Sequence, residues 1–371
     1  MRIGLLVGAL ERGGAERQLA QLAVGLKARQ HAVEVMCYAG AGPMDRFVEE
    51  QGIRVHRMDT SSKWGKLQAV RRWMKEFAPE VMHGCMKRAS SLAILANLRR
   101  SRCRVVASDM STASYGRHRP ELWPALVLFA LADVVVTQTE MNRRNLGQIA
   151  PWLRRKTRVI RNGVDTVRFQ PMDRSGHAGP FRFACVGTVY AIKNPVRVVE
   201  AVRLLREQGE SDFVLNWHGR AGLGNLGTQS HEYVQATELV RLYGLQGMVN
   251  FLGESDGIER AYRDADALVH VSVQEGIPNA VVEAMACGLP VIVSQVSDLP
   301  LLVQAADNGF VCDEKRPEAI AEAMRQMLRS TVRDRLAMGE RSRRLALEWF
   351  GRDRFIDDFE QLYQSLLTHS R

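Results

Sequence analysis

The chain of 371 residues is longer than a single hydrophobic core usually grows, about 250–300 residues, so we expect two domains. With 46% hydrophobic and 25% charged residues, its composition is typical of a globular protein. Six cysteines occur without a Cys-x-x-Cys pair, which argues against a zinc site or a disulfide framework and fits a reducing cytosol.

The formal net charge of +10 is concentrated in the first half of the chain. Residues 1–170 hold 29 Lys and Arg against 14 Asp and Glu, a net charge of +15, and the remaining residues hold 22 against 27, a net charge of −5. Such asymmetry indicates a polyanionic or membrane-surface partner for the first half. No nucleic-acid-binding motif accompanies this charge, so we expect no nucleic-acid partner.

Short apolar runs alternate with helix-like stretches along the chain. The expected strands are IGLLVGAL (3–10), HAVEVMCY (31–38), VMHG (81–84), RVVASD (104–109), DVVVTQT (133–139), RVIRNGV (158–164), FRFACVG (181–187), FVLNWHG (213–219), MVNFLG (248–253), ALVHVS (267–272), PVIVSQ (290–295) and GFVC (309–312). This alternation predicts an α/β fold with parallel sheets, which bind ligands at the carboxyl ends of their strands.

The polar run MDRSGHAGP, with two glycines and a proline, predicts an interdomain linker at residues 172–180. We therefore expect an N-terminal Rossmann-like domain over residues 1–171 and a second one over residues 181–350, with a ligand cleft between them. Residues 351–371 are predicted to form a C-terminal helix that packs back on the N-terminal domain.

Two glutamates stand eight residues apart in EGIPNAVVEAMACGLPVI (275–292). Glu275 follows an expected strand and Glu283 lies on an expected helix, where a buried carboxylate is costly without a partner. Pro278 suits the first turn of that helix, and N-terminal helix amides form a ready site for a phosphate or a sugar hydroxyl. One acid on each side of such a site suits a nucleotide-sugar; the alternative is a capped helix with incidental acids.

This stretch resembles the Glu-x7-Glu signature of a large family of retaining glycosyltransferases with the GT-B fold, family 4, which includes sucrose synthases and many bacterial polysaccharide enzymes. GGAER (13–17), RVIRNGVDTVRFQP (158–171), CVGTVYAIKNP (185–195) and VNFLG (249–253) follow in the family's order and spacing, so the resemblance covers nearly the whole chain. It implies two Rossmann-like domains that face each other across a cleft, with the acceptor on the first and the nucleotide-sugar on the second.

The resemblance also implies roles for single residues. Glu283 would hold the ribose hydroxyls and Glu275 the donor sugar, while the amides after Glu275 would meet the sugar and the β-phosphate. Glu275 and Lys193 are the expected catalytic residues, and Lys193 would neutralise the leaving diphosphate. The expected donor-binding residues are Gly13, Gly14, Thr188, Lys193, Glu275, Gly276, Ile277, Pro278, Asn279, Ala280 and Glu283.

Some positions leave alternatives open. Thr188 stands where the family usually has an arginine; this departure weakens the phosphate clamp and leaves one hydroxyl that could donate a hydrogen bond. His83 lies two residues before the position, here Cys85, at which many members carry a histidine; it is either a sugar or acceptor contact or a structural histidine. The Gly13-Gly14 turn either covers the donor phosphates or is only a tight turn.

The triplet Asp264-Ala265-Asp266 spells Asp-x-Asp, which binds a divalent metal in another glycosyltransferase fold. Here it leads into an expected strand, and the resemblance implies a metal-independent site. We therefore expect no metal and no cofactor other than the nucleotide-sugar co-substrate.

Two stretches offer basic, tryptophan-containing helices to an anionic membrane surface. In KWGKLQAVRRWMKEF (63–77) an apolar stripe begins at Trp64, and in RHRPELWPALVLF (117–129) basic residues precede Trp123. The alternative is an apolar stripe that packs on the sheet. Residues 1–10 fit a first strand rather than a secretory signal peptide, and the longest apolar run, 122–132, is too short to span a membrane.

These features together predict a retaining, metal-independent glycosyltransferase. It would move a hexose-type sugar from a UDP- or GDP-sugar to a hydroxyl of a lipid-linked glycan. The reaction would belong to cell-surface polysaccharide biosynthesis. The enzyme would be cytoplasmic and peripheral on the membrane. The alternatives are a soluble glycosyltransferase that makes a disaccharide or a small glycoside, and a nucleotide-sugar sensor without activity.

Overall fold

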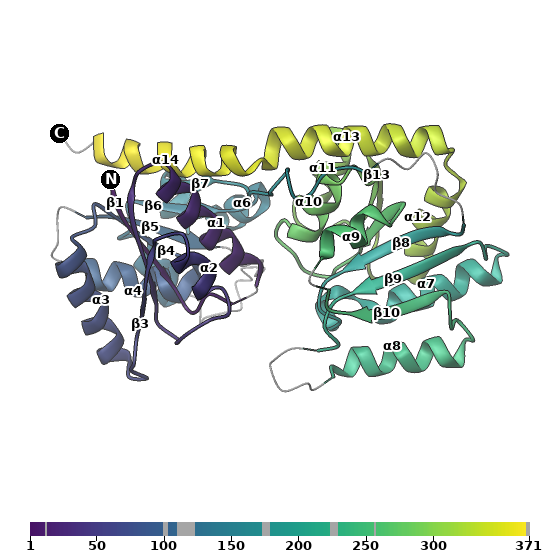
Figure 1. Ribbon diagram of the computed structural model, residues 1–371, viewed down its shortest axis with the longest axis horizontal. Helices are drawn as coiled ribbons and strands as arrows, with labels where there is room; N and C mark the ends of the chain where they lie inside the picture. The colour runs from purple at the N-terminus through teal and green to yellow at the C-terminus, as the bar shows by residue number, and fades with distance from the viewer. Residues whose placement is uncertain are drawn as a thin grey trace. The chain divides into compact units, whose positions relative to one another are not determined.

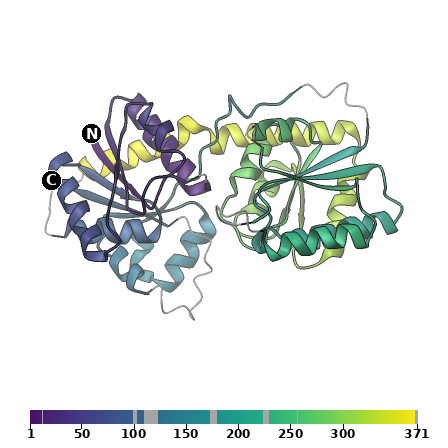
Figure 2. The ribbon, with the colours of Figure 1, turned by 60° about the horizontal axis from the view of Figure 1, so that its bottom comes forward.

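The computed structural model describes residues 1–11, 13–98, 103–109, 123–172, 179–222, 229–255 and 257–368. The chain forms two compact units, each built on its own parallel sheet with helices on both faces (Figures 1 and 2). Unit 1 comprises Met1–Gly163 and Arg352–Arg371, and unit 2 comprises Val164–Gly351. The α/β prediction of two Rossmann-like domains is confirmed.

The boundary between the units falls before the polar stretch at 172–180, of which residues 173–178 lie outside the described residues. Val164 donates its amide hydrogen to the carbonyl of Phe350 at 2.7 Å. Arg343 donates to the carbonyl of Phe169 at 2.7 Å, and the Phe169 ring is buried against Tyr262. Residues 164–169 therefore belong to unit 2, although we predicted them in the first domain, because contacts with residues far along the chain hold them there.

Unit 1 contains a seven-stranded sheet in the order β3-β2-β1-β4-β5-β6-β7, in which every pair is parallel. Its strands are β1 (Arg2–Val7), β2 (Ala32–Cys37), β3 (Arg54–Arg57), β4 (Val81–Gly84), β5 (Arg104–Asp109), β6 (Val134–Thr137) and β7 (Thr157–Val159). Its helices are α1 (Gly14–Ala28), α2 (Asp45–Glu49), α3 (Lys63–Phe77), α4 (Met86–Asn97), α5 (Trp123–Phe129), α6 (Glu140–Ile149), the 3-10 helix η2 (Pro151–Lys156) and α14 (Arg352–Thr368).

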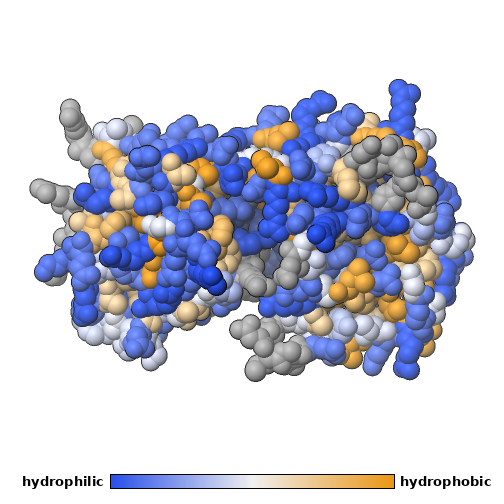
Figure 3. All heavy atoms as spheres, viewed as in Figure 1, coloured by the Kyte–Doolittle hydropathy of each residue, from blue (hydrophilic) through white to orange (hydrophobic). Residues whose placement is uncertain are grey.

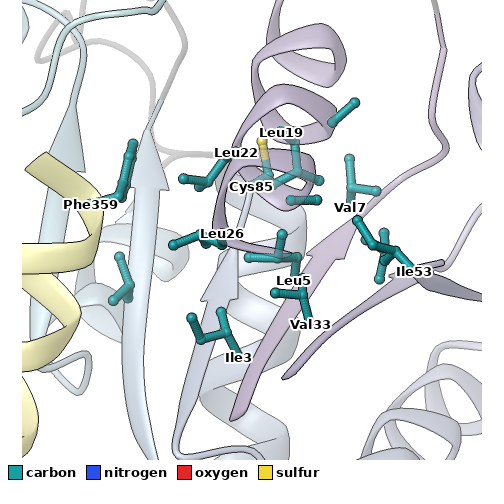
Figure 4. Packing of buried hydrophobic residues seen from close by; sticks show 14 of the residues in the cluster. Ile3, Leu5, Val7, Leu19, Leu22, Leu26, Val33, Ile53, Cys85 and Phe359 are labelled. Carbon is teal, nitrogen blue, oxygen red and sulfur yellow. The ribbon is translucent and has the colours of Figure 1, made fainter. Parts of the chain in front are cut away.

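Alternation along the strands gives this sheet two buried faces. Ile3, Leu5 and Val7 of β1 belong to one buried cluster with side chains of α1 and α14, part of which Figure 4 shows. Leu6, between them in sequence, points to the other face and packs with side chains of α3, α4 and α5. A strand buried on both faces reads as a continuous apolar run, which is why β1 is recognisable in the sequence.

The C-terminal helix α14 completes the core of unit 1. Phe355, Phe359 and Tyr363 are at most 3% exposed, and Gly25 of α1 leaves room for Ile356, whose side chain would collide with any Cβ at that position. Burying each of these large side chains stabilises the fold by roughly 1.5–3 kcal/mol. Unit 1 is thus built from both ends of the chain.

Helix α3 packs its apolar stripe on the sheet of unit 1. Val70, Trp73 and Met74 are at most 2% exposed, and Gly4 lies beneath the Trp73 ring, where an added Cβ would be 3.0 Å from it. Within the apolar stripe, Trp64 at the start of α3 is the one exposed residue, at 64%. The stripe that we considered for membrane contact therefore belongs to the core, which favours the alternative named for this helix.

Unit 2 contains a six-stranded parallel sheet in the order β10-β9-β8-β11-β12-β13. Its strands are β8 (Phe181–Val186), β9 (Phe213–His218), β10 (Val249–Gly253), β11 (Ala267–His270), β12 (Val291–Ser294) and β13 (Gly309–Cys312). Its helices are the 3-10 helix η3 (Ala191–Lys193), α7 (Pro195–Glu207), α8 (His231–Leu242), α9 (Ile258–Arg263), α10 (Asn279–Ala286), α11 (Leu299–Ala306), α12 (Pro317–Arg329) and α13 (Val332–Phe350).

The two faces of the second sheet carry different helices. Phe183 and Leu215 pack with side chains of α7, α8 and α12, and Leu268 and Val291 pack with those of α9, α10, α11 and α13. Between neighbouring strands β8 and β11, where the chain order reverses, the sheet has a switch point of the kind that holds ligands in doubly wound folds.

Hydrophilic side chains cover most of the face shown in Figure 3, with apolar ones in small scattered groups. Within the described ranges, none of the helices combines the length and the apolar composition needed to cross a membrane.

Candidate functional site

The loop after β11 brings the expected sugar-binding residues to the carboxyl end of the second sheet. Strand β11 ends at His270, Glu275 lies in the loop, and helix α10 begins at Asn279. Gly276, Ile277 and Pro278 are buried, so the loop is packed in place and does not hang in solvent. Pro278 is the N-cap of α10 with an extended backbone, one position before the first turn in which we expected it.

Glu275 meets two nitrogen donors through one of its oxygens. Oε1 forms an ion pair with Nζ of Lys193 from η3, and it lies 3.2 Å from Nε2 of His270. Ser272 places its hydroxyl 3.1 Å from the same His270 nitrogen. The structure therefore joins the two predicted catalytic residues, Glu275 and Lys193, in one contact.

The electrostatics of this cluster favour an ionised carboxylate. Burial raises the pKa of Glu275, but the hydrogen bond from His270 and the positive charge of Lys193 outweigh burial and lower the pKa to about 2. Burial is also the main cause that lowers the pKa of His270, with Lys193 adding to it, so the imidazole is neutral at pH 7. At pH 7 an ionised carboxylate therefore stands in the loop that leads into α10.

Glu283 lies one turn further along α10 and is 6% exposed. The hydroxyl of Tyr262 on α9 donates to Oε2 of Glu283 at 2.9 Å, and the Tyr262 side chain has no exposed surface. The buried carboxylate thus has the partner that its position on an apolar helix demands. This arrangement holds Glu283 in one orientation.

The loop that follows β8 carries Thr188 and leads to Lys193. Gly187 has φ +140° and accepts a hydrogen bond on its carbonyl from Nε1 of Trp217 at 2.8 Å. A Cβ on Gly219 would overlap that same carbonyl, so the two glycines allow the strand ends to approach closely. Thr188 is half-buried, and among the described residues its hydroxyl has no hydrogen-bond partner. The part of Thr188 in binding a phosphate stays a prediction.

Gly13 and Gly14 belong to unit 1, at the start of α1. Gly13 is the N-cap with φ −68°, so glycine is not needed there for a left-handed backbone. A Cβ on Gly13 would collide with the carboxylate of Glu16, and burial raises the pKa of Glu16. Gly13 and Gly14 thus begin helix α1, and their assignment to the donor phosphates stays a prediction.

His83 does not fit the role of a sugar or acceptor contact. Its side chain has no exposed surface, Nδ1 lies 2.6 Å from the hydroxyl of Tyr363, and Nε2 lies 2.5 Å from the hydroxyl of Ser108. Burial lowers its pKa to about 3. Of the two roles that we left open, the structure favours the structural one, because both ring nitrogens already bind protein hydroxyls inside unit 1.

The described residues contain no group of three or more His, Cys, Asp or Glu side chains placed to hold a metal ion. In the Asp-x-Asp triplet, Asp266 accepts a hydrogen bond from the amide of Arg182 at 2.8 Å, and Asp264 caps α9. The Asp266 carboxylate therefore holds the start of β8, and Asp264 closes the end of α9 through its backbone N–H.

Both halves of the chain match models of glycosyltransferase families. Residues 12–168 match Glycosyltransferase Family 4, and residues 172–345 match the glycosyl transferases group 1. By its fold and by these two matches, the chain is of the GT-B glycosyltransferase kind.

Individual relatives agree with this class. The chain is 31% identical over 179 residues to the putative colanic acid biosynthesis glycosyltransferase WcaL of Escherichia coli K12, which covers 46% of this chain and 42% of the relative. It is 26% identical over 226 residues to the UDP-Gal:alpha-D-GlcNAc-diphosphoundecaprenol alpha-1,3-galactosyltransferase of Escherichia coli, which covers 58% of this chain and 55% of the relative. The chain thus matches about half the length of these curated relatives.

Among solved structures, Anabaena HepE in complex with UDP superimposes with a TM-score of 0.85 at 20% identity, over 98% of this chain and 100% of HepE. The complex of HepE with UDP-glucose gives a TM-score of 0.84 at 19% identity over the same shares of the two chains. At this identity the similarity shows the fold, which is that of GT-B proteins.

Two residues of the candidate site were missed in the sequence. His270 ends an apolar strand, and Tyr262 lies on a short helix, so both look like ordinary core residues. A signal existed for His270: a histidine inside an apolar run, five residues before Glu275, is a buried polar group that needs a partner. For Tyr262, 21 residues before Glu283, we find no such signal.

Proposed function

We propose that this protein is a retaining, metal-independent glycosyltransferase that moves a hexose-type sugar from a UDP- or GDP-sugar to a hydroxyl of a lipid-linked glycan in cell-surface polysaccharide biosynthesis. One observation carries the proposal: Lys193, Glu275 and the start of α10 meet at the carboxyl end of the second sheet. A cation, an anion and a helix N-terminus at one point match a ligand in which a sugar is joined to a diphosphate.

In this proposal each group faces one part of the donor. Glu283 binds the ribose hydroxyls and Glu275 binds a hydroxyl of the sugar. The backbone N–H groups between Gly276 and Ala280, apart from Pro278, which has none, bind the sugar and the β-phosphate. Lys193, with Thr188 as a further donor, binds the diphosphate. Glu283 is already oriented by Tyr262, so the ribose would meet a prepared acceptor.

The chemistry needs stabilisation of a leaving diphosphate. The bond between the anomeric carbon and the phosphate oxygen breaks, and its electron pair stays on the diphosphate, where Lys193 and the helix N-terminus stabilise it. The acceptor hydroxyl forms its bond to the anomeric carbon from the same face, and its proton goes to the leaving phosphate oxygen. The ionised Glu275 stabilises the positive charge that develops on the sugar.

The lipid-linked acceptor is suggested by relatives and by the surface of unit 1. One relative's name specifies an acceptor on diphosphoundecaprenol. An apolar group, which we call the tryptophan surface, lies on α5, the turn after it and η2. It consists of Trp123, Val127, Leu131 and Trp152. Its members are 39–59% exposed.

The tryptophan surface has the composition of a membrane-docking site. The rings of Trp123 and Trp152 lie 6.2 Å apart, and Lys156 ties η2 to the end of α5 by donating to the carbonyls of Ala130 and Ala132 at 2.7 Å. Arg154 and Arg155, next to Trp152, are exposed. Indole rings beside arginines suit the headgroup region of an anionic bilayer. This surface supports the peripheral-membrane proposal over a soluble enzyme that makes small glycosides.

Transfer of labelled sugar to a lipid extract tests the proposal. The purified protein is incubated with labelled UDP- and GDP-sugars and polyprenol-linked acceptors, with EDTA present, and product is counted in the organic phase. We expect label in the organic phase with one donor, and its loss in Glu275→Gln. Binding of the donor without any transfer would favour the sensor alternative, and transfer only to water-soluble acceptors would favour the soluble enzyme.

A further inference from the structure

The carboxylate of Glu275 is held from one side only. Both of its contacts, with Nζ of Lys193 and with Nε2 of His270, go to Oε1. Among the described residues no group donates a hydrogen bond to Oε2. The side chain of Glu275 keeps 14% of its surface exposed. One oxygen is therefore anchored in the protein while the other remains available to a ligand hydroxyl.

The two anchors of Oε1 differ in how firmly the fold holds them. His270 is the last residue of β11, is 2% exposed at its side chain, and its strand pairs on both sides, with β8 and with β12. Lys193 is a flexible side chain at the end of η3, and its chemistry also suits a diphosphate. A bound diphosphate would compete with Glu275 for Lys193, whereas nothing in a nucleotide-sugar would displace His270.

The contacts of His270 define which of its nitrogens carries the proton. Nε2 faces two oxygens, Oε1 of Glu275 at 3.2 Å and Oγ of Ser272 at 3.1 Å. An unprotonated Nε2 would place a lone pair against a carboxylate, so a neutral His270 must carry its hydrogen on Nε2 and donate it to Glu275. The buried site thus holds one tautomer of the ring.

We propose that His270 is a positioning residue of the transfer reaction: it donates from Nε2 to Oε1 of Glu275 and so directs Oε2 to the donor sugar after Lys193 has turned to the diphosphate. The inference rests on the proposed function, because it assigns a role within the same site. In the described part of the chain, Lys193, Glu275 and the hydroxyl of Tyr190 are titratable groups around this contact. Burial raises the pKa of Tyr190, and the charge of Glu275 adds to that rise. The hydroxyl of Ser272 lies against the same nitrogen, 3.1 Å from Nε2.

Two variants separate the hydrogen bond from the packing. His270→Leu keeps the buried volume and removes the donor, and His270→Gln keeps an N–H close to the position of Nε2. We expect kcat to fall about ten- to a hundredfold in His270→Leu, since small displacements of a reacting group have effects of this size, and to recover largely in His270→Gln. His83→Gln, in which a buried histidine of unit 1 is changed, is the matched control.

The affinity for the donor is a second readout, and it would not change in the same way if His270 had only a structural role. In His270→Leu the affinity for the nucleotide-sugar should fall about fivefold relative to the affinity for the free nucleoside diphosphate, as expected for one weakened hydrogen bond to the sugar. In His83→Gln this ratio should stay at the wild-type value. The ratio of wild-type to His270→Leu activity should also grow as the pH falls from 7 to 4, because loss of the His270 donor lets the pKa of Glu275 rise.

The outcomes distinguish a failure of the proposed function from a failure of the positioning role of His270. Wild-type protein that neither binds nor uses any nucleotide-sugar would overturn the proposed function itself. An active wild type with an unchanged affinity ratio and an unchanged pH dependence in His270→Leu would overturn the positioning role alone. Equal losses in His270→Leu and His270→Gln would do the same, because they would show that packing and not the hydrogen bond matters.

Discussion

Tyr262 and Glu283 form a buried hydrogen bond, 2.9 Å from the phenol oxygen to Oε2 of the carboxylate. Tyr262 lies on α9 and Glu283 on α10, so the bond joins two helices on the same face of the second sheet. The ring of Phe169 supports Tyr262 from the segment that begins unit 2. Glu283 is therefore oriented by unit 2 before any ligand arrives.

Tyr262→Phe should weaken both stability and donor binding. Removal of the hydroxyl leaves a buried carboxylate with one partner fewer, which costs about 1–3 kcal/mol. We expect a lower free energy of unfolding of unit 2 and a higher KM for the donor, with a smaller change in kcat, because the ribose lies away from the reacting bond. Denaturant unfolding and initial rates measure these effects. Tyr243→Phe, at the end of α8, is the control. A donor KM equal in both variants would contradict the assignment of Glu283 to the ribose.

Lys193→Met should abolish most of the turnover. The cation stabilises charge that develops on the leaving diphosphate, and loss of one such group typically costs about 10²–10³ in kcat. Lys193→Arg should restore only part of the activity, since the planar guanidinium does not match the contact of a point charge. Steady-state kinetics with saturating donor measure this. Lys315→Met removes an exposed lysine of the same unit and should leave kcat unchanged. If Lys193→Met turned over like Lys315→Met, the proposed leaving-group role would be wrong.

His83 should make unit 1 less stable in mild acid. Its pKa is about 3 in the folded protein and near 6.5 when unfolded, so the unfolded chain takes up a proton below pH 6.5 that the folded chain refuses. Stability is then lost as the pH falls from 6.5 towards 3. Between pH 7.5 and 5.5 this loss amounts to about 1.4 kcal/mol.

Denaturant unfolding of unit 1 at these two pH values checks the effect. His83→Gln cannot titrate, so it should lose about 1.4 kcal/mol less than wild type over the same interval. It should be less stable than wild type at pH 7.5, because the contacts with Tyr363 and Ser108 are disturbed. A pH dependence identical in both proteins would mean that His83 is protonated in the fold.

The tryptophan surface should govern membrane binding. Trp152→Ala removes an exposed indole from it, and we expect binding to vesicles with anionic lipid to weaken about tenfold, with further weakening at high salt because the neighbouring arginines act through charge. Co-sedimentation with vesicles measures this. Leu242→Ala, at an exposed apolar position of unit 2, is the control, and Trp64→Ala tests helix α3 separately. Equal binding to neutral vesicles, or a larger loss in Trp64→Ala, would contradict the assignment to this surface.

The sheets could be predicted because their strands are buried on both faces and read as apolar runs. Strand β3 was missed because it lies at the sheet edge, where Arg54, His56 and Arg57 break the apolar pattern. The unit boundary was misplaced because the hydrogen bond between Val164 and Phe350 joins residues that no local pattern connects.

The candidate site was predictable in part because its charged residues interrupt the pattern of the sequence around them. Glu275, Glu283 and Lys193 stand out as charged residues within apolar or turn-forming stretches. Their partners do not: Lys193 and Glu275 are 82 residues apart, and only the pairing of β8 with β11 brings the loops after these strands together. Contacts set by strand order are invisible to periodicity, which is why the contact of Lys193 with Glu275 had to come from the structure.

The most direct test of a nucleotide-sugar site is the thermal unfolding midpoint of wild type and Glu283→Ala with UDP, GDP and their common sugar conjugates. A ligand that binds only the folded state raises the midpoint by mass action. We predict a clear rise with one nucleotide class, a further rise with one of its sugar conjugates, and neither in Glu283→Ala. No rise with any of these ligands, or the same rise in both proteins, would contradict the account.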